Sequence, residues 1–201
     1  MTEDRLPPLT PDLLDDAQRA LYERITGGPR GSAPQGGGSL VEADGRLAGP
    51  FGPMLLDPPI GDALQELGAA LRYRGVLPAS ARELVICCVA AHHGSEFEWR
   101  VHAPLARDAG VAEDDLDRVR TGGSPAGGSA ADREAARAAL ALMTHGDLED
   151  DEFEAARAAI GEAGIFEVTA LVGYYTTLSL QLRLFRRDAR DTEGHGRHHD
   201  P

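Results

Sequence analysis

Cysteine is scarce in this chain, which has 201 residues and only the adjacent pair Cys87 and Cys88. Neighbouring residues on a helix point about 100° apart, so a disulfide between these two would be strained. Both lie in the apolar stretch 84–90, where an unpaired cysteine is typical of a small buried residue. Because the sequence has no CxxC motif, a dithiol redox centre is excluded.

Long apolar runs are also absent. No uninterrupted run approaches the roughly 20 apolar residues that cross a bilayer. Residues 1–11 lack the basic and apolar segments of a secretory signal. We therefore expect no membrane association and, by default, a cytoplasmic location.

Positive charge is in short supply as well. Twenty basic residues face 33 acidic ones, and the formal net charge is -13. Proteins usually bind a phosphate backbone by neutralising it with Lys and Arg, so nucleic-acid binding is not expected. The densest basic run, residues 183–190, is interpreted as a solvated helix end, where cations complement the carbonyl dipoles.

Helical patterns fill most of the chain. Apolar spacing and end signals predict helices over residues 11–25, 57–74, 79–94, 95–110, 111–120, 131–144, about 150–163 and 165–187. The first is expected to be capped by Thr10, and the second to present one apolar face of Ile60, Leu64, Leu67 and Leu71. The fold class is therefore all-α, with a central helical hairpin around Gly94.

The length fits one domain with loose ends. We expect residues 1–53 to form an N-terminal helix and a Gly/Pro-rich loop, residues 54–190 a helical domain, and residues 191–201 a disordered tail. The tail contains three histidines, but a flexible terminus offers nothing to orient metal ligands, so no metal site is expected. The final helix is apolar on more than one face, which indicates a central position or a subunit interface.

Two stretches share the pattern S-x-x-E just before helical apolar spacing. They are Ser80 to Glu83 and Ser95 to Glu98. The pattern is typical of a capping box, in which the serine side chain bonds an amide of the first turn and the glutamate returns to the serine amide. In that interpretation neither glutamate has a chemical role.

Helical spacing offers a second interpretation. Ser95, Glu98 and His102 stand at positions i, i+3 and i+7, so they share one side of the second helix. Glu83 reaches the same point if the hairpin turns it inward. A histidine with carboxylates close by is a candidate proton shuttle. Trp99 beside it is either a core residue or a pocket wall.

Residues 82–86 (Arg-Glu-Leu-Val-Ile) and 95–110, which contain Phe-Glu-Trp-Arg-Val-His at 97–102, resemble the core of the carboxymuconolactone decarboxylase family. The resemblance is strong over about 54–110, extends loosely to 167–175, and implies the all-helical AhpD-like bundle. The peroxidase branch has a glutamate, a CxxC and a histidine. The matching positions here are Glu83, Ser95, Glu98 and His102. Because both cysteines are replaced, alkylhydroperoxidase activity is not expected.

The decarboxylase branch implies a small carboxylated lactone that loses CO2 and then regains a proton. In this scheme His102 is the acid/base, and Glu83 or Glu98 orients its imidazole. Ser95 would donate to a substrate carbonyl or position water.

The substrate carboxylate needs a cation, for which Arg82 and Arg100 are candidates that also fit a solvated surface. Trp99 completes the expected substrate-binding set. The scheme requires no metal and no organic cofactor. The implied partners are a small-molecule substrate and further copies of the chain in a dimer, trimer or hexamer.

Two alternatives stay open. The same His–Glu pair would also serve isomerisation, dehydration or lactone hydrolysis of another secondary metabolite. Alternatively, the chain is a non-catalytic oligomeric binding module on a once-catalytic fold. The module predicts that His102 and Glu83 are buried away from any cavity, whereas the enzymes need them to open onto one.

Overall fold

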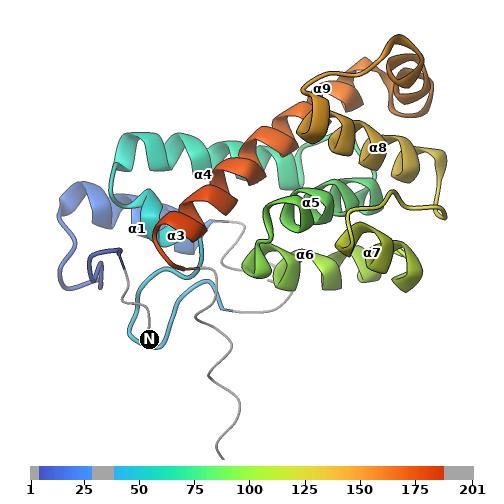
Figure 1. The fold of residues 1–201 in the computed structure, drawn as a ribbon. Helices are drawn as coiled ribbons and strands as arrows, with labels where there is room; N and C mark the ends of the chain where they lie inside the picture. Colours follow the sequence, from blue (N-terminus) through green and yellow to red (C-terminus); the bar gives the residue numbers. More distant parts are fainter. Residues whose placement is uncertain (1–4, 29–38, 188–201) are drawn as a thin grey trace, which may run out of the picture.

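A computed structural model describes residues 5–28 and 39–187. In these residues the chain is helical and forms no strand beyond one isolated bridge between Val41 and Leu47. The helices are α1 (Asp16–Gly27), α3 (Phe51–Met54), α4 (Pro58–Tyr73), α5 (Ala79–His93), α6 (Glu96–Asp108), α7 (Glu113–Arg120), α8 (Ala130–His145) and α9 (Asp150–Leu184) (Figure 1). The predicted all-α class is confirmed.

Helix α5 is the centre of the bundle. It packs against α6, α7, α8 and α9, while α4 joins α1 and α3 to the second half of α9. Figure 1 shows α8 and α9 on one side of α5 and α6 and α7 on the other. Nearly all of α5 is apolar and buried, as expected for a helix enclosed on several faces.

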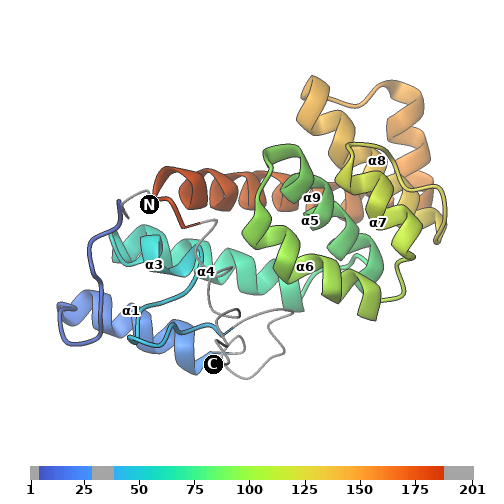
Figure 2. The same ribbon diagram turned by 60° about the horizontal axis from the view of Figure 1, so that its bottom comes forward.

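The predicted hairpin is formed by α5 and α6 (Figure 2). Gly94 ends α5 in the left-handed conformation, with φ of +63°, which glycine adopts at little cost. The next amide, that of Ser95, donates to the carbonyl of Ala90 at 2.8 Å. This tight turn makes Ser95 the N-cap of α6 and sends α6 back along α5.

The first helix begins later than predicted. Asp15, not Thr10, is the N-cap of α1. Its carboxylate accepts from the Gln18 amide at 2.8 Å, and the Gln18 side chain accepts from the Asp15 amide at 3.1 Å. This reciprocal capping box outcompetes the proline start that the sequence suggested.

The predicted apolar face of α4 is only half right, because Leu71 is buried and Leu64 packs against the core but the other two residues do not. Ile60 is 60% exposed and Leu67 42%, whereas the buried residues are Gly61, Gln65, Gly68 and Leu71. The reason is close packing, because a Cβ on Gly61 would lie 2.1 Å from the carbonyl oxygen of Met54. Glycine brings α4 against α3 and turns larger apolar side chains outward.

Gly61→Ala is therefore expected to lower the free energy of unfolding by about 1–3 kcal/mol, since backbone on α3 must move. Gly173→Ala is the matched control on α9, because a Cβ there meets nothing within 4 Å. It should be neutral or raise stability by roughly 0.5–1 kcal/mol. Urea unfolding of both variants measures this, and equal losses would contradict the packing explanation.

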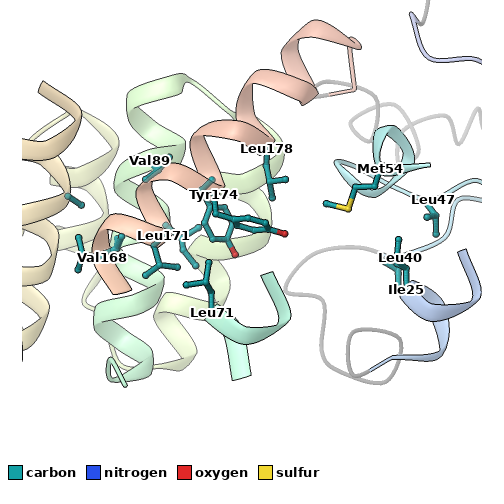
Figure 3. Close-up of a cluster of buried hydrophobic side chains, with 14 of the residues drawn as sticks. Ile25, Leu40, Leu47, Met54, Leu71, Val89, Val168, Leu171, Tyr174 and Leu178 are labelled. Atoms are coloured by element: carbon teal, nitrogen blue, oxygen red, sulfur yellow. The ribbon is translucent and has the colours of Figure 1, made fainter. Parts of the chain in front are cut away.

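Two helices were predicted where α9 runs, and the backbone does break at Gly161, with φ of 67° and ψ of 172°. After this break α9 crosses the molecule and fills the core. Figure 3 shows Leu171, Tyr174 and Leu178 packed with Leu71 of α4 and Val89 of α5. The helix also leaves four large side chains exposed: Phe153 before the break, and Phe166, Leu180 and Leu184 after it.

The end of α9 corrects one sequence interpretation. Arg187 was expected in a solvated helix end, but it is buried. It forms an ion pair with Glu42 and donates to the carbonyl of Leu47 at 3.1 Å. These contacts tie the end of the last helix to the segment before α3.

Some predictions fall on other parts of the chain. The tail expected to be disordered, residues 191–201, lies outside the described residues, as do residues 29–38 of the Gly/Pro-rich loop. In the described residues, no helix combines the length and the apolar character that a membrane span needs.

Candidate active site

The start of α5 is not capped as predicted. Pro78 is its N-cap and makes no side-chain capping bond. The hydroxyl of Ser80 instead donates to Asp132 of α8 at 2.6 Å. The capping-box interpretation of Glu83 is therefore wrong, and its carboxylate is left for another partner.

The second box is only half formed. The Ser95 hydroxyl accepts from the Glu98 amide at 3.4 Å, as a cap does. The Ser95 amide, however, already donates to Ala90 across the hairpin turn. The Glu98 carboxylate has no return bond to make there and lies beside His102 instead.

His102 lies between two carboxylates. Its Nδ1 is 2.7 Å from Oε2 of Glu83, and its Nε2 is 3.4 Å from Oε2 of Glu98. Glu83, Glu98 and His102 are each less than 5% exposed. The hairpin supplies Glu83 from α5 and the other two from α6, one turn apart. Glu83 does turn inward, which the sequence left open.

The electrostatics favour a charged pair. Burial lowers the pKa of His102, but its hydrogen bonds to Glu83 and Glu98 outweigh burial and raise it above the usual value. Burial raises the pKa of Glu83, yet the hydrogen bond and charge of His102 outweigh burial and hold it below the usual value. Both shifts favour the charged forms, an imidazolium at His102 and a carboxylate at Glu83.

One carboxylate oxygen has no donor. Oε1 of Glu98 is buried and makes no hydrogen bond to the described residues. A buried carboxylate oxygen without a donor is unfavourable and is uncommon in folded proteins. It is an acceptor that a ligand or a transferred proton would satisfy.

Arginines lie near Glu83. Nε of Arg82 is 3.5 Å from Oε1 of Glu83, and the charges of Arg82 and Arg72 both help to lower the Glu83 pKa. Arg82 was predicted from sequence, whereas Arg72 was missed. It ends α4, which is far from Glu83 in sequence, so no local pattern could have signalled it.

Tyr175 of α9 is a second residue that the sequence analysis missed. Its ring packs edge-on to the His102 ring, with centroids 5.1 Å apart and an interplanar angle of 86°. Tyr175 is buried, and its other ring neighbour is Tyr174. The only available signal was an adjacent pair of tyrosines in a helix that otherwise looks like core.

Two other predicted residues have different surroundings. The guanidinium of Arg100 lies 5.3 Å from the centroid of the Phe97 ring. Trp99 packs against the buried cluster that contains Leu84, and the guanidinium of Arg120 lies 4.6 Å from its ring centroid. The contacts of Trp99 fit its interpretation as a core residue.

The cysteines are inert by their environment. Cys87 and Cys88 are buried. Burial raises the pKa of Cys88 to about 12 and that of Cys87 well above its usual range. Since the thiolate is the nucleophile, neither cysteine is poised for thiol chemistry.

The described residues have no group of three or more His, Cys, Asp or Glu side chains that could hold a metal ion. They line a cavity of about 450 Å³ between α8 and the start of α9, and another of about 440 Å³ beside α1 and α4. Neither lining includes Glu83, Glu98 or His102. Close to Glu98, Gly49 packs so tightly on the Phe97 ring that a Cβ would lie 2.1 Å from it.

An all-helical bundle with this central hairpin is the fold of AhpD-like proteins. Residues 58–141 match the model of the Carboxymuconolactone decarboxylase family. The predicted resemblance is confirmed over these residues, and the predicted AhpD-like fold is the one that the solved structures share. No curated protein sequence matches the chain.

Solved structures support the same fold. An uncharacterised peroxidase-related protein from Ralstonia eutropha JMP134, with an alkylhydroperoxidase AhpD core, is 15% identical with a TM-score of 0.70, over 95% of this chain and 94% of its own. A putative antioxidant defence protein AhpD from Agrobacterium tumefaciens is 19% identical with a TM-score of 0.56, over 65% and 90%. The debrominase Bmp8 is 14% identical with a TM-score of 0.57, over 86% and 85%.

Proposed function

We propose that this chain is a cofactor-independent acid–base enzyme that acts on a small carboxylated lactone or a related metabolite, in the manner of a carboxymuconolactone decarboxylase. One observation carries the proposal: the buried imidazole of His102 is held by Glu83 at 2.7 Å and by Glu98 at 3.4 Å. Two partners fix both the orientation and the charge of the ring, which is what a proton-transfer group requires.

In this mechanism the bond from the lactone ring to its carboxylate breaks, CO2 leaves, and the electron pair stays on the substrate as a dienolate. The proton on Nε2 of His102 then moves to carbon, and water returns a proton to the imidazole. Glu83 keeps the ring in place and stabilises its charged form. Oε2 of Glu98 is the partner of Nε2, and Oε1 of the same carboxylate is unpaired. This Oε1 can hold the proton on its way back to the imidazole.

We assign binding of the substrate carboxylate to Arg82. Arg72 takes the second position that the sequence analysis gave to Arg100. Arg82 and Arg72 both act on Glu83 electrostatically, and Nε of Arg82 is buried without a hydrogen bond to the described residues. A guanidinium matches a carboxylate in geometry and charge. Ser95 stays a candidate for positioning water at the same end of α6.

The protein is further proposed to act as a homo-oligomer in the cytoplasm on a small molecule. The exposed Phe166, Leu180 and Leu184 of α9 are the surface that we assign to self-association.

A non-catalytic binding module is the second candidate. The observation that favours it is the burial of Glu83 and His102, together with their absence from the linings of the two described cavities. The enzyme instead requires a path by which substrate reaches the buried His102.

Turnover of carboxymuconolactone, followed by ultraviolet absorbance, tests the proposal. Glu98→Gln is expected to lower kcat by roughly 10²–10⁴-fold, the range for a lost acid–base group. Glu96→Gln is the matched control two residues away, because Glu96 is exposed and pairs with Arg120. Equal rates in the two variants would contradict the role of Glu98, and an inactive wild type would favour the binding module.

A further inference from the structure

The hydroxyl of Tyr175 has no partner among the described residues. The side chain is 7% exposed, and its ring packs on the rings of His102 and Tyr174. Tyr22 shows the usual behaviour, since its hydroxyl donates to the carbonyl of Gly45 at 2.9 Å. A buried phenol normally finds an acceptor. The Tyr175 hydroxyl is thus a hydrogen-bond donor that the described residues leave unused.

His102 does not accept this hydrogen bond. Both ring nitrogens of His102 are taken, Nδ1 by Glu83 and Nε2 by Glu98. The edge-on packing of the two rings, 5.1 Å apart, fixes the phenol beside the imidazole without a bond between them. The phenol is therefore available to donate to a molecule that enters the site.

The phenol also stays protonated. Burial, then the negative charge of Glu98, and then Tyr174 and Glu83, raise the pKa of Tyr175 well above its usual value. A phenol that cannot ionise is a hydrogen-bond donor throughout the physiological pH range. Such a donor stabilises negative charge that develops on oxygen, and it does so most strongly in a site that excludes water.

We propose that Tyr175 is a catalytic residue that donates its hydroxyl hydrogen bond to the oxygen of the substrate that becomes negative when the dienolate forms. The inference rests on the proposed function and narrows its substrate class to compounds with a lactone or enol oxygen within reach of both Tyr175 and His102. His102 handles the proton at carbon, and Tyr175 holds the oxyanion. No covalent bond to the protein is formed.

The test compares Tyr175→Phe with Tyr174→Phe. Both replacements remove only a hydroxyl, the two residues are adjacent and buried, and only Tyr175 packs on His102. Binding of 4-nitrophenolate, an oxyanion whose absorbance reports its ionisation, is measured by titration for the wild type and both variants. Circular dichroism and the urea midpoint confirm that each variant is folded.

Tyr175→Phe is expected to weaken 4-nitrophenolate binding at least tenfold, as befits a hydrogen bond to a charged acceptor, and Tyr174→Phe to leave it within twofold. In the carboxymuconolactone assay, kcat should fall roughly a hundredfold in Tyr175→Phe with little change in KM. If Tyr175 were purely structural, its replacement would not lower kcat while leaving KM unchanged.

The outcomes are distinguishable. Tyrosine-dependent binding of the probe without any turnover by the wild type supports the oxyanion donor and counts against the proposed reaction alone. Turnover that Tyr175→Phe leaves unchanged overturns the inference and spares the proposed function. Equal weakening by the two variants, or no binding of the probe to the wild type, also overturns it.

Discussion

Replacing His102 by alanine is expected to lower the free energy of unfolding by about 3–5 kcal/mol, the usual loss when one partner of a buried charge pair is removed. The variant leaves the carboxylates of Glu83 and Glu98 facing an empty space, with no positive charge between them. Their desolvation is then uncompensated, so at least one must take up a proton to remain buried. Urea unfolding at neutral pH measures the loss.

The matched control is His93→Ala. His93 is also a helical histidine, but it makes one bond, between Nε2 and the Thr176 hydroxyl at 3.0 Å, and lies near the end of α5. Its loss should be about 1 kcal/mol. Adding Glu83→Gln to His102→Ala should restore part of the stability, because a neutral amide is easier to bury than an unpaired carboxylate. Equal losses for His102 and His93, or no recovery in the double variant, would contradict the buried charge pair.

The second large effect is on the pH dependence of the free energy of unfolding, and a variant at Glu83 tests it. The folded pKa of His102 is raised, so its contribution to stability is complete below about pH 6.5 and is lost as the pH rises through the folded value. The folded pKa of Glu83 is lowered, so its contribution is complete above about pH 4.3 and is lost as the pH falls through the folded value. The pair therefore stabilises the fold fully between these limits.

Glu83→Gln keeps an acceptor for Nδ1 of His102 but removes the charge. The pKa of His102 is expected to fall toward or below its ordinary value, and the loss of stability on the alkaline side should shrink. Nitrogen NMR of the His102 ring, recorded across the pH range for wild type and variant, measures the first effect, and urea midpoints measure the second. Glu113→Gln is the control, because its exposed ion pair with Arg107 is remote from the buried ring. An unchanged His102 titration in Glu83→Gln would show that Glu83 does not set the charge of the ring.

The sequence predicted the helices well where local signals agree. Gly94, Ser95 and the apolar run before them specify the α5–α6 hairpin, because a left-handed glycine and a capping serine leave few other conformations. The start of α1 was missed because two capping signals compete and the Asp15 box wins. Half of the face of α4 was missed because Gly61 carries no apolar signal of its own, yet decides the closest contact.

In the site, too, local spacing was predictable from the sequence and tertiary contacts were not. Glu98 and His102 share a helix, so their spacing alone placed them together. Glu83 fitted a capping pattern equally well, and Asp132, which takes the Ser80 hydroxyl away from capping, is about fifty residues distant. Arg72 and Tyr175 reach the site only through the packing of α4 and α9. Tertiary contacts of this kind leave no periodic mark in the sequence.

The most direct test of the central claim is the rate at which the purified chain consumes carboxymuconolactone, compared with its His102→Ala and Glu98→Gln variants under conditions where all are folded. The proposal predicts measurable turnover by the wild type, and losses of roughly 10²-fold or more in both variants. Turnover that survives the loss of His102 would contradict an acid–base centre at this histidine.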